Sequence, residues 1–132
     1  MVNIVIPARR RRAGTHHFSE GVMSECIIYI TASSMEEAEI IGQNLVSKRL
    51  AACVNIIDNM KSIYHWQGKI ETANEVIVIA KTKNELINEL TEQVKTLHSY
   101  ECPCIVAYPL IGGNEAFLKW IRDETKQNTP KY

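Results

Sequence analysis

A succession of strand, helix and strand occurs twice in this chain, on either side of a segment with a different pattern. The first copy has an apolar strand at 26–31, a helical pattern over 35–49 and a second strand at 51–57. The second copy begins with a strand at 75–81 and ends with one at 104–108. Two such units joined by a hairpin form the split βαβ, or ferredoxin-like, arrangement, with an antiparallel sheet and both long helices on one face. We therefore predict an α+β fold of this class.

Each long helix is predicted by a capping signal followed by a stripe of apolar residues. Ser34 lies three residues before Glu37, and Thr82 lies three residues before Glu85, as in a capping box. Gly42, within the first helix, permits a close approach to the sheet. The apolar stripes consist of Ala38, Ile41 and Leu45 in the first helix and Leu86, Leu90, Val94 and Leu97 in the second. This spacing places the apolar residues on one face of each helix.

The segment between the two units predicts a protruding β-hairpin. Residues 60–66 alternate in character, Gln67 and Gly68 mark a turn, and a return strand follows. A lone hairpin is only marginally stable, yet this one carries large aromatic side chains such as those of Tyr64 and Trp66. We therefore expect these side chains to contact the body of the domain or another chain.

The two ends of the chain differ from its central region. Residues 1–24 show no sustained periodicity and include the basic run 9–12, so we expect a flexible leader before a single domain at 25–132. Near the other end, apolar residues at helical spacing predict a short helix over 116–121. The second face of the sheet is apolar too and needs a cover, for which the candidates are this helix, the hairpin or a neighbouring subunit.

The charge of the chain is balanced overall but unevenly distributed. Its 132 residues include fifteen basic and fifteen acidic side chains, of which eleven and fourteen, respectively, follow residue 24. This distribution gives the domain no basic face for nucleic acid, and no run approaches the ~20 apolar residues that cross a membrane. Four cysteines are too few for a disulfide scaffold in a chain of this size, so a reducing cytosol is the expected location.

The turn before the last strand gathers more coordinating and titratable groups than any other segment. It reads His98-Ser99-Tyr100-Glu101-Cys102-Pro103-Cys104. An imidazole with thiolates suits copper or zinc better than magnesium or calcium. The structural alternative is that these residues pack and cap a helix-to-strand junction. Because the sequence has no nucleophile elbow, phosphate loop or metalloprotease helix, we predict no enzymatic activity.

Five segments carry a further, more specific signal. They are Arg49-Leu50-Ala51-Ala52-Cys53-Val54-Asn55-Ile56, Ser62-Ile63-Tyr64-His65-Trp66-Gln67-Gly68-Lys69-Ile70-Glu71, Lys81-Thr82, His98-Ser99-Tyr100-Glu101-Cys102-Pro103-Cys104-Ile105 and Phe117-Leu118-Lys119-Trp120-Ile121. In this combination they resemble the CutA family of divalent-cation-tolerance proteins, over about residues 27–125. The resemblance implies a homotrimer of ferredoxin-like subunits, with hairpin strands that carry Tyr64 and Trp66 pairing across subunits. It also implies a role in divalent-metal tolerance, copper especially, without an obligatory cofactor.

The chain departs from the family pattern in the loop that begins at His98. The family loop usually reads His-Pro-Tyr-Glu-x-Pro-Glu, whereas this chain has Ser99 for the proline and Cys104 for the last glutamate. The copper ligands proposed for the family are the loop histidine, that glutamate and, in some members, a first-strand cysteine, whose position here is Ile30. The resemblance therefore gives His98 and Cys104 as predicted ligands for copper or another divalent metal. A thiol at 104 can bind a soft metal better than a carboxylate, or it can simply pack.

A second class of function competes with metal binding. The predicted architecture also resembles PII-type regulatory trimers, which bind a small ligand between subunits. In that hypothesis Lys81, Tyr100 and Glu101 line an inter-subunit cleft, and Lys81 meets an anion. The same residues can instead form salt bridges and hydrogen bonds within the interface. Our leading prediction is a soluble, cytoplasmic, non-enzymatic homotrimer that binds divalent metal ions and has no nucleic-acid or membrane partner.

Overall fold

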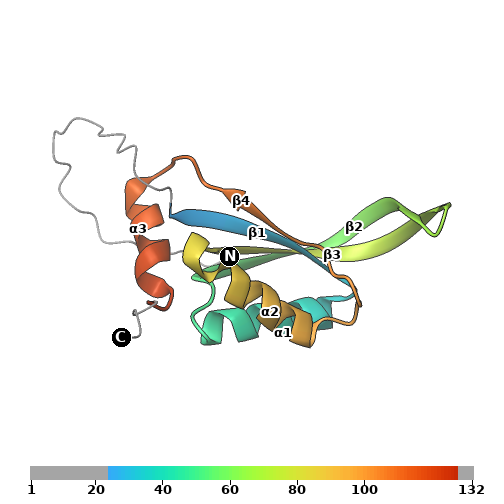
Figure 1. Cartoon of the computed structure of the whole chain (residues 1–132), viewed down its shortest axis with the longest axis horizontal. Coiled ribbons are helices and arrows are strands. Elements are labelled where there is room, and N and C mark those ends of the chain that lie inside the picture. Colours follow the sequence, from blue (N-terminus) through green and yellow to red (C-terminus); the bar gives the residue numbers. More distant parts are fainter. Residues whose placement is uncertain (1–23, 128–132) are drawn as a thin grey trace.

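The computed structural model describes residues 24–127, in which helices α1 and α2 lie on one face of a four-stranded sheet (Figure 1). In chain order the elements are β1 (Glu25–Ala32), α1 (Met35–Ser47), β2 (Cys53–Trp66), β3 (Lys69–Lys83), a 3₁₀ turn (Asn84–Leu86), α2 (Ile87–Leu97), β4 (Ile105–Pro109) and α3 (Glu115–Glu124). All strand pairs are antiparallel, and the strand order is β2-β3-β1-β4. This order is that of the split βαβ arrangement, so the predicted α+β fold is confirmed. The predicted leader, 1–24, lies outside the described residues except for Ser24.

The core fills the space between the sheet and the two long helices. Successive side chains of a strand point to opposite faces, so alternate residues of β1 and β3 face the helices. Ile28 and Ile30 on β1 and Val78 and Ala80 on β3 are all fully buried. The helical residues that meet them, also with 0% exposure, are Ala38, Ile41, Leu45, Leu86, Leu90 and Val94. These residues belong to the predicted apolar stripes, so the placement of both helices on one face is confirmed.

The start of α1 contains the capping interaction that the sequence predicts. The Ser34 side chain accepts a hydrogen bond from the backbone N–H of Glu37 at 3.1 Å. The Glu37 carboxylate accepts one from the backbone N–H of Ser33 at 2.7 Å, one residue before the position used in a capping box. Further along the helix, a Cβ on Gly42 would lie 3.2 Å from Val54 Cγ1. The predicted close approach of helix and sheet is therefore also confirmed.

The capping box predicted at the start of the second long helix is wrong. Thr82 belongs to β3 and is fully buried, and its hydroxyl donates a hydrogen bond to the carbonyl of Leu50 at 2.7 Å. The chain leaves the sheet through the 3₁₀ turn, and α2 begins after Leu86 without a side-chain cap. The contact of Thr82 with the connection between α1 and β2 joins residues far apart in sequence, so local spacing could not reveal it.

The far parts of β2 and β3 leave the body of the sheet as a two-stranded arm, residues 60–75 (Figure 1). The pairing continues past an irregularity after Ile57 and ends at the pair Trp66 and Lys69. Gln67 (φ 49°) and Gly68 (φ 78°) form the turn, both in the left-handed region that a type I′ turn requires. The predicted hairpin is confirmed, although its strands continue β2 and β3 rather than forming a separate element.

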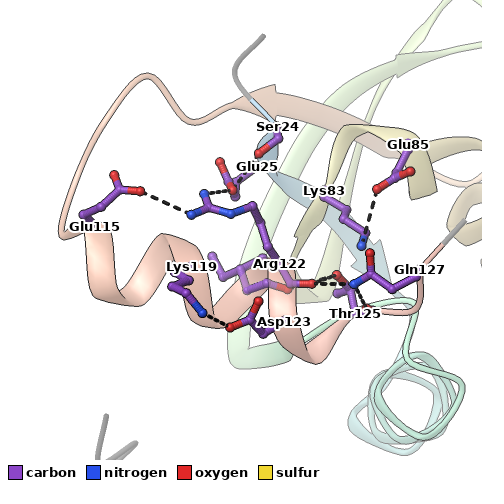
Figure 2. A network of polar contacts seen from close by, with 11 residues as sticks. Ser24, Glu25, Lys83, Glu85, Glu115, Lys119, Arg122, Asp123, Thr125 and Gln127 are labelled. Carbon is purple, nitrogen blue, oxygen red and sulfur yellow. Dashed lines mark hydrogen bonds and ion pairs between the residues drawn. The ribbon is translucent and has the colours of Figure 1, made fainter. Parts of the chain in front are cut away.

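Helix α3 closes one end of the domain, where polar contacts attach it to β1 (Figure 2). The Asn114 side chain caps the helix by accepting a hydrogen bond from the Ala116 backbone N–H at 3.1 Å. Arg122 pairs with the carboxylate of Glu25 on β1 and, at 3.2 Å, with that of Glu115. Because Glu25 is largely buried, this guanidinium compensates a carboxylate that would otherwise be costly to bury. The predicted short C-terminal helix is therefore confirmed.

Candidate functional site

The face of the sheet turned away from α1 and α2, here called the open face, is only partly covered by the described chain. The register of the four strands places on it Ile27, Tyr29, Thr31, Cys53, Asn55, Ile57, Ile77, Ile79, Lys81, Val106 and Tyr108. Ile57 is 50% exposed, Val106 44% and Tyr108 56%. Helix α3 reaches one end of this face, where the Phe117 ring lies 5.6 Å from Lys81 Nζ. The predicted second apolar face is thus present and largely open.

The imidazole of His98 is engaged at both ring nitrogens. The helix α2 ends at Leu97, and His98 follows in an extended conformation. Its Nε2–H donates to the carbonyl of Thr31 at 2.7 Å, and its Nδ1 accepts from the backbone N–H of Tyr100 at 3.0 Å. This pair of bonds requires the neutral ring with its proton on Nε2. The side chain is also fully buried, so neither nitrogen is free to bind a metal in this conformation.

The loop that follows His98 is attached to α1 through Glu37. The Glu37 carboxylate accepts hydrogen bonds from the backbone N–H of Ser99 at 2.5 Å and from the Ser33 hydroxyl at 2.6 Å. Partial burial opposes its ionisation, but the hydrogen bonds from Ser33 and Ser99 prevail and lower the pKa of Glu37 from 4.5 to about 2. A proline at 99 would have no N–H to donate, so the departure from the family loop creates this contact.

Cys104 lies just before β4 with an exposed side chain. Desolvation raises the pKa of its thiol above 9.0, as does the nearby charge of Glu75, while a hydrogen bond with Thr31 acts in the opposite direction. These three residues are therefore neighbours at one end of the open face. Within residues 24–127, no group of three or more histidine, cysteine or acidic side chains is placed to hold a metal ion. The described part of one chain consequently offers Cys104 no complete ligand set.

The residues of the hypothetical ligand cleft lie far apart within one chain. The Tyr100 hydroxyl donates to Glu75 Oε2 at 3.2 Å, and burial followed by the charge of Glu75 raises the pKa of Tyr100. Lys81 lies six residues beyond Glu75 on β3, which at the usual rise of a strand is about 20 Å. Glu101 is exposed on the loop. One chain therefore brings Tyr100 near Glu75 but does not bring Lys81 to either of them.

Sequence reasoning missed Glu75 and Asn55 as members of this face. Glu75 is only 9% exposed, and Asn55 accepts a hydrogen bond from Lys81. The available signal was strand periodicity, because residues two apart on the predicted strands share a face. Applied to 75–81 and 51–57, it places Glu75, Lys81 and Asn55 opposite the core residues.

The aromatic residues predicted to contact a partner lie on the arm. Tyr64 and Trp66 share one of its faces and are 42% and 59% exposed. Ile63 and Ile70 lie on the other face and are 70% and 71% exposed. Both faces of the arm therefore present large apolar side chains to the surroundings of the chain.

These features define a class of protein: a small ferredoxin-like α+β domain with an open apolar sheet face and a projecting arm. The helices within residues 24–127 are all too short or too polar to cross a membrane. The family model for the CutA1 divalent ion tolerance protein matches residues 26–124. The chain therefore belongs to the CutA1 divalent ion tolerance family.

Individual relatives agree with this assignment. A divalent-cation tolerance protein CutA from Archaeoglobus fulgidus is 53% identical over 98 residues, which cover 74% of this chain and 94% of that protein. A chloroplastic protein CutA from Arabidopsis thaliana is 32% identical over 130 residues, or 92% of this chain and 71% of that one. The solved structure of a divalent cation tolerance protein from Thermus thermophilus matches with a TM-score of 0.76 at 43% identity and covers 77% of this chain and 99% of its own.

Proposed function

We propose that this chain acts in divalent-metal tolerance by binding copper, or another divalent metal, as a homotrimer. The observation that carries the proposal is the exposed thiol of Cys104 beside the carboxylate of Glu75 on the open face. Thiolates favour copper and zinc over magnesium and calcium, and a neighbouring carboxylate adds negative charge. The metal is bound cargo in this proposal rather than a resident cofactor of the fold.

Assembly would supply the further metal ligands that residues 24–127 of one chain do not provide. Since no group of three ligands forms within residues 24–127, further donors to a metal at Cys104 must come from another copy or from water. The open face and the arm favour such an assembly because they expose large apolar side chains: Ile57, Tyr108 and Trp66 are each at least half exposed. In a closed ring of three, every arm has a neighbour on each side, which suits an arm with two apolar faces.

His98 is the less favoured of the two predicted ligands. To bind a metal through Nε2 it must release Thr31, and to bind through Nδ1 it must release Tyr100. The His98 side chain is itself fully buried, so binding a metal would require it to give up one of these bonds and to become accessible. We therefore place Cys104 first among the ligands and assign His98 a supporting role in the loop.

The remaining parts of the proposal concern location and activity. Cys26 and Cys53 are free thiols within the described chain, as are Cys102 and Cys104, which fits a reducing compartment such as the cytoplasm. The names of the relatives state tolerance to cations rather than a reaction. We propose no catalytic role.

Isothermal titration calorimetry with Cu²⁺ and Zn²⁺ tests the proposal on the full chain. We expect Cys104→Ala to weaken copper binding at least about tenfold, because it removes the thiolate. His98→Ala should lower stability and leave the copper affinity nearly unchanged. The opposite pattern would make His98 the ligand, and equal binding by all three proteins would remove the metal site from this loop. Sedimentation of the wild type at micromolar concentration tests the trimer, which a monomer would contradict.

A further inference from the structure

Lys81 occupies an unusual position for a lysine. It lies on β3, one of the two inner strands, on the open face rather than at the rim of the sheet. Its cross-strand neighbours on that face are Cys53 on β2 and Ile27 on β1, and Ile79 follows two residues away on the same side. Lys81, Ile27 and Ile79 are all partly buried. An ammonium group thus lies within a surface that is otherwise largely apolar.

The contacts of the ammonium group satisfy only part of its hydrogen-bonding capacity. Lys81 Nζ donates to Asn55 Oδ1 at 2.6 Å, lies 3.9 Å from Cys53 Sγ and is 5.6 Å from the centre of the Phe117 ring. A lysine has three N–H donors. Here one oxygen and a weak sulfur acceptor receive two of them, and the aromatic ring adds only a cation–π contact. None of these three groups is a carboxylate.

No carboxylate in residues 24–127 lies within 4.0 Å of Lys81 Nζ, unlike the arrangement at most other lysines. Those with an acidic partner are Lys83, Lys95, Lys119 and Lys126. Those without one, apart from Lys81, are Lys48, Lys61 and Lys69, and all three are exposed to water. Glu75, the largely buried acid of the open face, is about 20 Å away along β3. Among the lysines of residues 24–127, Lys81 is therefore the partly buried one that has no carboxylate partner within that part of the chain.

We propose that Lys81 and Asn55 form a binding site for an oxyanion, a carboxylate or phosphate group, with the Phe117 ring as one wall. Asn55 Oδ1 already accepts from Lys81, so the amide N–H groups of Asn55 remain to donate to the same anion as the ammonium. Phe117 and Trp120, with ring centres 5.5 Å apart, border the site with apolar surface. Such surroundings strengthen a charged contact by limiting its exposure to water. The site uses none of the residues proposed to hold a metal.

The oxyanion can come from a dissolved small molecule or from an acidic side chain of a second copy, and an NMR titration distinguishes the two. Sodium phosphate and sodium citrate are added to the full chain at constant ionic strength, and the Asn55 side-chain amide signals are followed. For a dissolved anion, we expect saturable shifts whose midpoint concentration rises roughly ten- to a hundredfold in Lys81→Met. Lys48→Met, which removes an exposed lysine just after α1 and away from the open face and the arm, is the matched control and should behave as the wild type.

Sedimentation equilibrium on the same proteins provides the second arm. If a second copy supplies the anion, phosphate and citrate give no saturable shift. In that case Lys81→Met raises the concentration at which the assembly dissociates at least about tenfold, whereas Lys48→Met does not. If Lys81→Met fails to fold, Asn55→Ala replaces it. This variant should weaken anion binding if the wild type binds a dissolved anion, and assembly if a second copy supplies the anion. Wild-type behaviour of Lys81→Met, or of Asn55→Ala in its place, in both experiments would overturn the proposal.

Discussion

The two faces of the sheet are built from the same strands and differ in almost every other respect. On the face covered by α1 and α2, Ile28, Ile30 and Val78 have no exposed surface. On the open face, Ile57, Val106 and Tyr108 retain about half of theirs, and polar groups such as Lys81 and Glu75 are interspersed. Since adjacent residues of one strand supply both faces, strand propensity cannot explain the difference.

The difference indicates that the two faces serve separate purposes. The covered face is apolar apart from Thr82, whose hydroxyl is hydrogen-bonded, and α1 and α2 close it, which is what subunit stability requires. The open face combines apolar area with groups that have specific chemistry, Lys81 near α3 and Cys104 near Glu75. Substitutions on the covered face should therefore change the free energy of unfolding, and substitutions on the open face should change assembly and binding.

The largest expected effect follows from truncating a residue at the centre of the covered face. Ile30→Ala removes three methyl or methylene groups from a fully buried position, which should cost about 2–5 kcal/mol of unfolding free energy. Ile40→Ala is the matched control, because Ile40 is 50% exposed on α1 and should lose less than about 1 kcal/mol. Denaturant unfolding at fixed protein concentration measures both. Equal losses would show that the covered face is not the stabilising one.

The next effect should be confined to assembly. Ile57→Asp places a carboxylate on the open face, where a second copy would have to bury it, so the assembly should dissociate at a concentration at least about tenfold higher. Far-UV circular dichroism of the variant should match that of the wild type, since Ile57 is 50% exposed within its own chain. Ile40→Asp has the same starting exposure on a helix and should leave assembly unchanged. If Ile40→Asp dissociated and Ile57→Asp did not, the subunit interface would lie at α1 instead of the open face.

Local patterns predicted most of the covered face. The strand at 26–31, the cap at Ser34 and the stripe that contains Leu90 are formed by residues close in sequence, and the structure has all three. Each depends on the period of a strand or helix, or on a hydrogen bond spanning three residues, so the information is local. The prediction at Thr82 was wrong because its decisive partner, the carbonyl of Leu50, is distant in sequence.

The candidate site was less accessible to sequence reasoning for the same reason. The family resemblance gave His98 as a metal ligand, but its partners Thr31 and Tyr100 depend on how the loop passes over β1. The contact between Asn55 and Lys81 requires the register of β2 against β3. Metal binding by Cys104 remains a prediction.

A smaller effect concerns the polar link between the covered layer and the loop at 98–104. The pKa of Glu37 is lowered from 4.5 to about 2, so its ionised form is stabilised in the folded chain. This contribution is complete above about pH 4.5 and is lost as the pH falls toward 2, where the folded chain takes up the proton. Glu37→Gln should lower stability at pH 7 by about 1 kcal/mol and flatten the loss of stability between these pH values.

Unfolding midpoints measured by circular dichroism from pH 7 to pH 2 provide this test. Glu92→Gln is the control, because Glu92 pairs with Lys95 on the exposed surface of α2 and should leave the acid profile unchanged. An unaltered profile in Glu37→Gln would mean that the link from Ser33 and Ser99 to this carboxylate does not contribute to stability.

The smallest effect tests how tightly the covered face is packed at its margin, where α1 crosses the outer strand β2. A Cβ added in Gly42→Ala would lie 3.2 Å from Val54 Cγ1 and 3.6 Å from Ile56 Cδ1, both side-chain atoms. Val54 and Ile56 line an open groove of about 370 Å³ beside the helix, so they have room to yield a few tenths of an ångström. Alanine also removes the cost of glycine inside a helix, about 1 kcal/mol. We therefore expect Gly42→Ala to raise the unfolding free energy by up to about 1 kcal/mol, as measured by denaturant unfolding. A loss of stability instead would show that the margin is packed as tightly as the centre around Ile30.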